Sequence, residues 1–151
     1  MTRRLDHQAL APEGMRALGA VHVYVSQSGL PPLLIDLIYL RVSQINGCAY
    51  CISLHTRDLL KAEVPYGKLM MLSAWREAGA LYSDEERAAL AWAESVTRVA
   101  DTGVPDDAFT AAAAHFGEKA LVDLTLAIGV INSFNRMAIS FRATPLSIPA
   151  R

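Results

Sequence analysis

The chain has little cysteine, no excess of either charge, and no uninterrupted apolar run of the length that spans a membrane. Its 151 residues include two cysteines, and 14 basic residues stand against 15 acidic ones, for a net charge of −1. This balance provides no electrostatic footprint for nucleic acid or for an anionic membrane surface. We therefore expect neither as a partner.

Two segments indicate where the protein resides. The N-terminal "MTRRLDHQAL" has basic residues without the apolar run that follows them in a secretory signal. The late apolar segment "LVDLTLAIGVINSFNRMAISF" is interrupted by polar side chains, which argue against a membrane span. These are Asp123, Asn132, Asn135 and Arg136. We expect a cytoplasmic protein, and in a reducing cytosol two close cysteines favour catalysis or metal binding over a structural disulfide.

Apolar residues recur at helical spacing along nearly the whole chain, and no segment has the pattern of a β-hairpin. A chain of this length is typical of one domain with a sizeable core. We predict an all-α, single-domain bundle of about six to seven helices over residues 1–151. Hydrophobic residues make up 52% of the chain, a surplus that an oligomer interface would bury. The predicted helices cover about 12–26, 32–46, 48–62, 66–79, 83–101, 105–116 and 118–142.

The segment "SQINGCAYCISLHTRDL" contains both cysteines, Cys48 and Cys51, together with His55. The spacing i, i+3, i+7 places the three side chains on one face of a helix. Cys48 lies in the first turn, where free N–H groups and the helix dipole favour a thiolate. His55 follows Cys51 by one turn and can take its proton directly or through a water. The segment thus combines a nucleophile, a second thiol able to form a disulfide with it, and a base.

Two other interpretations of this segment are open. The cysteines could be small buried apolar residues, or they could bind zinc with His55. Zinc needs a fourth ligand, and the remaining histidines lie in other segments. We therefore favour redox chemistry and predict no metal and no organic cofactor.

The stretches "LRVSQINGCAYCISLHTRDLLKAE", "LSAWREAG" and "ERAALAWAESVT" resemble the AhpD-like alkylhydroperoxidases of the carboxymuconolactone decarboxylase family. The later "HFGEKALVDLTLAIGVINSFNRMAI" is similar to the closing helix of that family, at about 118–142. The resemblance covers about 31–142, with the motif region at 31–62. It implies an all-helical fold assembled as trimers or hexamers, and reduction of peroxides through the cysteine pair. It also implies a lipoyl-bearing or small dithiol reductant.

The family motif places a Glu twelve residues before the first cysteine of Cys-x-x-Cys-x-x-x-His. By this resemblance Cys51 attacks the peroxide, Cys48 resolves the product as a disulfide, and His55 relays protons. Asp36 stands at the Glu position, and its side chain is shorter by about 1.5 Å. The helix-terminus argument favours Cys48 as the more acidic thiol. We choose Cys51 as the attacking residue because its base is one turn away.

The function predicted is a thiol peroxidase acting on alkyl hydroperoxides, with hydrogen peroxide as a further substrate. Two alternatives are a lactone-handling decarboxylase on the same fold, and a redox sensor or disulfide-exchange protein without turnover. Outside the motif, we expect Asn132 and Asn135 to join helices or subunits, and His22 to be a hydrogen-bonded core or interface residue. Trp75 and Trp92 are expected in the core.

Overall fold

The computed structural model describes residues 2–146, and all regular structure in this range is helical, with nine α-helices and two short 3-10 helices. The predicted all-α class is therefore confirmed, whereas the predicted count of six to seven helices is too low. The α-helices are α1 (His7–Leu10), α2 (Pro12–Ser26), α3 (Pro32–Asn46), α4 (Ala49–Lys61), α5 (Tyr66–Met70), α6 (Asp84–Thr97), α7 (Val99–Thr102), α8 (Asp106–Ala113) and α9 (Glu118–Phe141). The 3-10 helices are η1 (Leu72–Ala74) and η2 (Gly79–Leu81).

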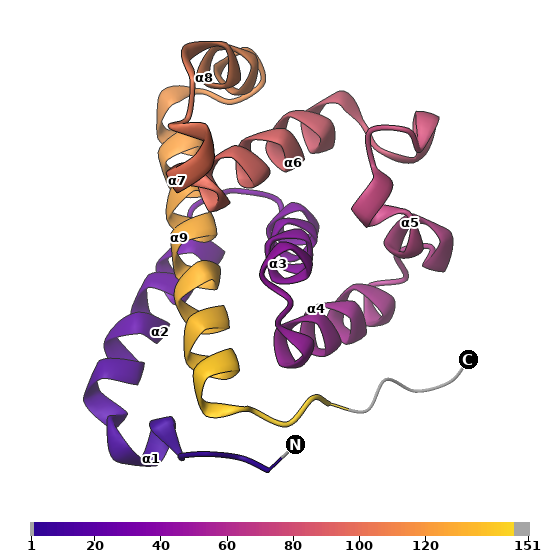
Figure 1. The fold of residues 1–151 in the computed structure, drawn as a ribbon. Coiled ribbons are helices and arrows are strands. Elements are labelled where there is room, and N and C mark those ends of the chain that lie inside the picture. Colours follow the sequence, from indigo (N-terminus) through magenta and orange to yellow (C-terminus); the bar gives the residue numbers. More distant parts are fainter. Residues whose placement is uncertain (1, 147–151) are drawn as a thin grey trace.

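Helix α3 lies at the centre of the molecule, with α4, α6 and α9 packed around it (Figure 1). Helix α2 lies along the outer side of α9. Eight of the 15 residues of α3 are buried. Polar residues on this helix are therefore close to other helices, where they need partners.

Helix ends follow the local sequence. Pro12 and Pro32 each occupy the first position of a helix, where the missing N–H costs nothing. Gly47 ends α3 with φ at 70°, in the left-handed region that glycine adopts without strain. The Ser83 hydroxyl and the Glu86 carboxylate form the predicted capping box at the start of α6. The turn at Gly47 matters most for function because α4 and the cysteines follow it directly.

The prediction of one helix over 66–79 is wrong. The segment divides into α5, η1 and a series of turns that leads to η2. Its buried side chains, Leu69, Leu72 and Trp75, recur every three residues, which matches the tighter 3-10 pitch better than an α-helix. The predicted helix over 83–101 also breaks, because α6 ends at Thr97 and the Thr102 hydroxyl donates to the Ser95 carbonyl at 2.8 Å.

Helix α9 is long and apolar enough to cross a membrane by length and composition alone. A core helix of a folded domain meets the same criterion. In this structure α9 packs against α2, α3 and α6. Its buried polar residues have partners on those helices: Asp123 accepts from the Tyr24 hydroxyl at 2.9 Å, and Asn135 donates to Ser43 Oγ at 3.0 Å. We therefore describe α9 as the long core helix of the fold.

The two terminal segments converge at one end of the molecule. The Arg4 N–H donates to the Phe141 carbonyl at 3.0 Å, which holds the segment before α1 against the end of α9. After α9, the Leu146 N–H donates to Ser53 Oγ of α4 at 2.9 Å. Both segments consequently border the space between α2, α3, α4 and α9.

Candidate active site

A cavity of about 790 Å³ lies in that space and brings together three of the four predicted site residues. Asp36 from α3 and Cys51 and His55 from α4 line its wall. Cys48 is not among the lining residues and is 1% exposed. The two cysteines are free thiols with unequal access, because only Cys51 faces the cavity.

Cys48 stands at the N-cap of α4, one position before the helix begins, rather than inside its first turn as predicted. The Cys51 thiol donates a hydrogen bond to the Cys48 sulfur. This contact is the main reason that the pKa of Cys48 lies below its usual range. Burial opposes the shift, whereas the N–H groups of Cys51 and Tyr50 and the side chain of Asn135 assist it. A thiolate on Cys48 is thus stabilised by the helix terminus and by its neighbours.

The pKa of the Cys51 thiol is shifted in the opposite direction. The hydrogen bond from Cys51 to Cys48 raises the pKa of Cys51 most. Burial and the electrostatic effect of a thiolate on Cys48 raise it further. Cys48 is therefore the more acidic thiol of the pair, and a thiolate forms on it before it forms on Cys51. This is the direction that the helix-terminus argument predicts.

His55 is hydrogen-bonded to Asp36, with Nδ1 and Oδ1 3.1 Å apart. The shorter side chain of Asp36 therefore reaches the imidazole without a bridging water. His55 is 7% exposed, and its second nitrogen, Nε2, is left for proton transfer. The structure thus joins Asp36 and His55 in the cavity that Cys51 enters.

An amide network behind the cysteines joins α3 to α9. The Asn46 side chain donates to Asn132 Oδ1 and Asn135 Oδ1, both at 2.9 Å. Asn135 is fully buried and donates to Ser43 Oγ at 3.0 Å. The prediction that these asparagines join helices is confirmed. Sequence reasoning missed that Asn135 also bonds to the thiols, and only its position in an apolar helix pointed to a buried role.

Tyr39 and His22 are the other residues that sequence reasoning missed at this site. Tyr39 is buried, and its hydroxyl forms a hydrogen bond of 3.3 Å with His22 Nδ1. Its ring packs against the His55 ring with centroids 5.0 Å apart, and both Tyr39 and His22 line the cavity. His22 was expected in the core or at an interface; it is hydrogen-bonded but exposed in this chain, because it lies where α2 borders the cavity.

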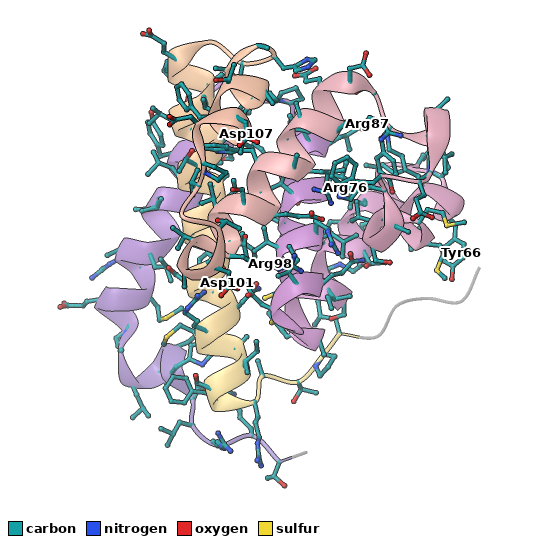
Figure 2. All side chains as sticks on the ribbon, turned by 45° about the horizontal axis from the view of Figure 1, so that its top comes forward. Tyr66, Arg76, Arg87, Arg98, Asp101 and Asp107 are labelled. Carbon is teal, nitrogen blue, oxygen red and sulfur yellow. The ribbon has the colours of Figure 1, made fainter. Side chains whose placement is uncertain are left out.

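A second buried polar cluster surrounds Glu94 of α6. One carboxylate oxygen accepts from Arg41 Nη2 at 2.7 Å and from Trp75 Nε1 at 2.9 Å, and the other accepts from Arg76. Figure 2 shows Arg76 beside α6, close to Arg87, which donates to the Arg76 carbonyl. Burial raises the pKa of Glu94, but these donors outweigh it and leave the pKa below its usual range. Trp75 and Trp92 are both buried, as predicted.

Within residues 2–146 no three His, Cys, Asp or Glu side chains are grouped so as to hold a metal ion.

The chain belongs to the carboxymuconolactone decarboxylase family, whose model matches residues 10–95. The predicted resemblance to the AhpD-like proteins of this family is confirmed. The crystal structure of ATU0492 from Agrobacterium tumefaciens superposes with a TM-score of 0.93 at 40% identity, covering 97% of this chain and 99% of that one. ATU0492 is a protein of unknown function for which a role in antioxidant defence, as AhpD, is suggested.

Two further relatives come from sequence comparison. YdfG of Bacillus subtilis, itself uncharacterised, is 39% identical over 140 residues, covering 93% of this chain and 95% of YdfG. The alkyl hydroperoxide reductase AhpD of Koribacter versatilis is 41% identical over 81 residues, covering 52% of this chain and 40% of that protein.

Proposed function

We propose that this protein is a thiol peroxidase that reduces alkyl hydroperoxides, and hydrogen peroxide as a smaller second substrate, through Cys51 and Cys48. One observation carries the proposal: Cys51 faces a cavity of about 790 Å³ beside the His55–Asp36 pair, with the Cys48 sulfur behind it. The cavity is of the size that small organic ligands occupy in proteins. An organic hydroperoxide can therefore reach Cys51.

The reaction begins with attack of the Cys51 thiolate on the outer oxygen of the peroxide. The O–O bond breaks, Cys51 becomes a sulfenic acid, and an alcohol leaves after protonation. Cys48 then attacks the Cys51 sulfur, water leaves, and a disulfide forms. A reductant reopens this disulfide by thiol exchange.

Access and acidity favour different cysteines for the first step, and we assign it to Cys51. Cys48 is the more acidic thiol of the resting pair, but it does not line the cavity. Cys51 becomes the nucleophile when its proton moves to Cys48 across their hydrogen bond, or to His55. If Cys48 takes this proton, it gives it up in the second step, when the sulfenic oxygen leaves as water.

The partners proposed with this function come from the family resemblance. They are a peroxide substrate, a lipoyl-bearing or small dithiol reductant, and further copies of the chain in a homo-trimer or homo-hexamer. The reaction requires no cofactor beyond the redox-active pair, and a reducing cytoplasm would supply the dithiol.

The test of the function is a count of free thiols after one equivalent of an alkyl hydroperoxide is added to the reduced protein. We expect the loss of both thiols per chain within seconds, and no such loss in the Cys51→Ser variant. A dithiol in excess should then sustain repeated peroxide consumption. Loss no faster than that of a free small thiol would contradict a peroxidase, and one fast oxidation without turnover would indicate a redox sensor.

A further inference from the structure

Tyr39 is the buried titratable group at the cavity that the steps above leave unused. Its hydroxyl is held by His22 from α2, and its ring lies against His55 from α4. Tyr39, His22 and Cys51 all line the same cavity. Burial, with the nearby charge of Asp36 as a second cause, raises the pKa of Tyr39 well above its usual range. The hydroxyl therefore stays protonated and remains available as a donor.

Peroxide reduction needs such a donor. When the O–O bond of an alkyl hydroperoxide breaks, the leaving oxygen departs as an alkoxide, a strong base that must be protonated. His55 can return the proton that it takes from Cys51, but when that proton moves to Cys48 instead, His55 holds no additional proton for the alkoxide. Cys48 does not line the cavity and therefore cannot reach the leaving oxygen.

We propose that Tyr39 donates its hydroxyl proton to the leaving alkoxide and that His22 holds this hydroxyl and returns the proton from solvent. The inference rests on the proposed peroxidase function. In the step, the Cys51 sulfur takes up the outer oxygen as a sulfenic acid, while the inner oxygen takes the Tyr39 proton and leaves as an alcohol. The tyrosinate regains a proton from His22, which is exposed and is reprotonated by water.

The experiment compares two oxidants in single turnover, an alkyl hydroperoxide and peracetic acid. Both transfer an oxygen atom to the same thiolate, but peracetic acid releases acetate, a weak base that needs no proton donor. We expect Tyr39→Phe to slow oxidation by the alkyl hydroperoxide by about 10²- to 10⁴-fold, the range of general acid catalysis. Oxidation by peracetic acid should stay at the wild-type rate, which also shows that the variant is folded.

Tyr66→Phe is the matched control. Tyr66 is exposed and does not line the cavity, so the loss of its phenol should change neither rate. For His22 we expect a smaller loss with the alkyl hydroperoxide in His22→Ala, and recovery in His22→Gln, which retains a group able to hold the hydroxyl.

Three results would overturn the proposal. Equal slowing of both oxidants by Tyr39→Phe would mean that Tyr39 has a structural role. No slowing of either would mean that another group protonates the alkoxide. If wild-type protein reacts slowly with both oxidants, the peroxidase function fails and the role of Tyr39 fails with it.

Discussion

The molecule buries two polar clusters against α3, and they differ in how completely their groups are satisfied. Glu94 accepts hydrogen bonds on both carboxylate oxygens from Arg41, Trp75 and Arg76. The Cys51 thiol is hydrogen-bonded to Cys48 and faces a cavity. Glu94 also borders a cavity, of about 440 Å³, but its oxygens are already occupied. A buried carboxylate whose oxygens are all occupied has no site left to react and is costly to unpair, whereas a thiol that faces a cavity can meet a substrate.

The first prediction concerns the cavity side and has the largest effect. His55→Gln should reduce the rate of peroxide-driven thiol loss by about 10²- to 10⁴-fold, because it removes the base that accepts the Cys51 proton. Stability to urea should change little. His115→Gln, at an exposed position, is the control and should keep the wild-type rate. Equal rates in both variants would remove His55 from the mechanism.

The opposite outcome is expected at Glu94. Glu94→Gln should lower the free energy of unfolding by about 3–5 kcal/mol, because it leaves Arg41 buried without its counter-charge. The rate per folded molecule should be unchanged. Because the native pKa of Glu94 is lowered, its contribution is present above the pKa of a free Glu and is lost as pH falls through the native value. Urea unfolding of wild type and variant should therefore converge on acidification; a constant difference would contradict the assignment.

A third prediction tests the amide behind the thiols. Asn135→Leu removes a donor that lowers the pKa of Cys48, so less thiolate forms at neutral pH. In wild type the oxidation rate should persist below the pKa of an ordinary thiol and fall as pH drops through the lowered pKa of Cys48. In Asn135→Leu this fall should occur at higher pH. The variant should also lose about 1–3 kcal/mol of stability, because Ser43 and Asn46 lose a partner.

Asn132→Leu is the control for this pH profile. Asn132 belongs to the same network but does not bond to the thiols. Asn132→Leu should lower the free energy of unfolding, while the pH at which the oxidation rate falls should stay that of the wild type. A shift of equal size in both variants would show that the profile reports general loosening of the site.

The smallest effect is expected at Arg76. Its side chain is 58% exposed, so solvent screens its ion pair with Glu94, and Arg76→Ala should cost about 1 kcal/mol or less. Arg41 and Trp75 continue to satisfy the carboxylate. Urea unfolding of Arg76→Ala and Glu94→Gln, each compared with the wild type, measures the two losses of stability. Comparable losses in the two variants would mean that the exposed ion pair supports the cluster.

Local chemistry in the sequence was sufficient to predict the helix ends at Pro12, Pro32 and Gly47 and the capping box at Ser83. These features depend on neighbouring residues alone. The segment after Pro65 was predicted incorrectly because its path is set by burial of Trp75 against Glu94, a contact between residues 19 apart.

The same distinction applies to the candidate site. Cys48, Cys51 and His55 lie within one helical segment, so their spacing predicted a shared face. Tyr39 and His22 come from different helices, and their hydrogen bond joins positions 17 apart. The sequence around these residues gave no sign that they belong to the site. Tyr39 has the pattern of a core aromatic residue, and His22 that of a histidine on an apolar helix face.

The most direct test of the account is mass spectrometry of Cys48→Ser and Cys51→Ser after one equivalent of an alkyl hydroperoxide, with a reagent that traps sulfenic acids. The cavity-facing sulfur should take the oxygen, so we predict a trapped sulfenic acid on Cys51 in Cys48→Ser and none on Cys48 in Cys51→Ser. A sulfenic acid on Cys48 alone would contradict the account and assign the attack to the more acidic thiol.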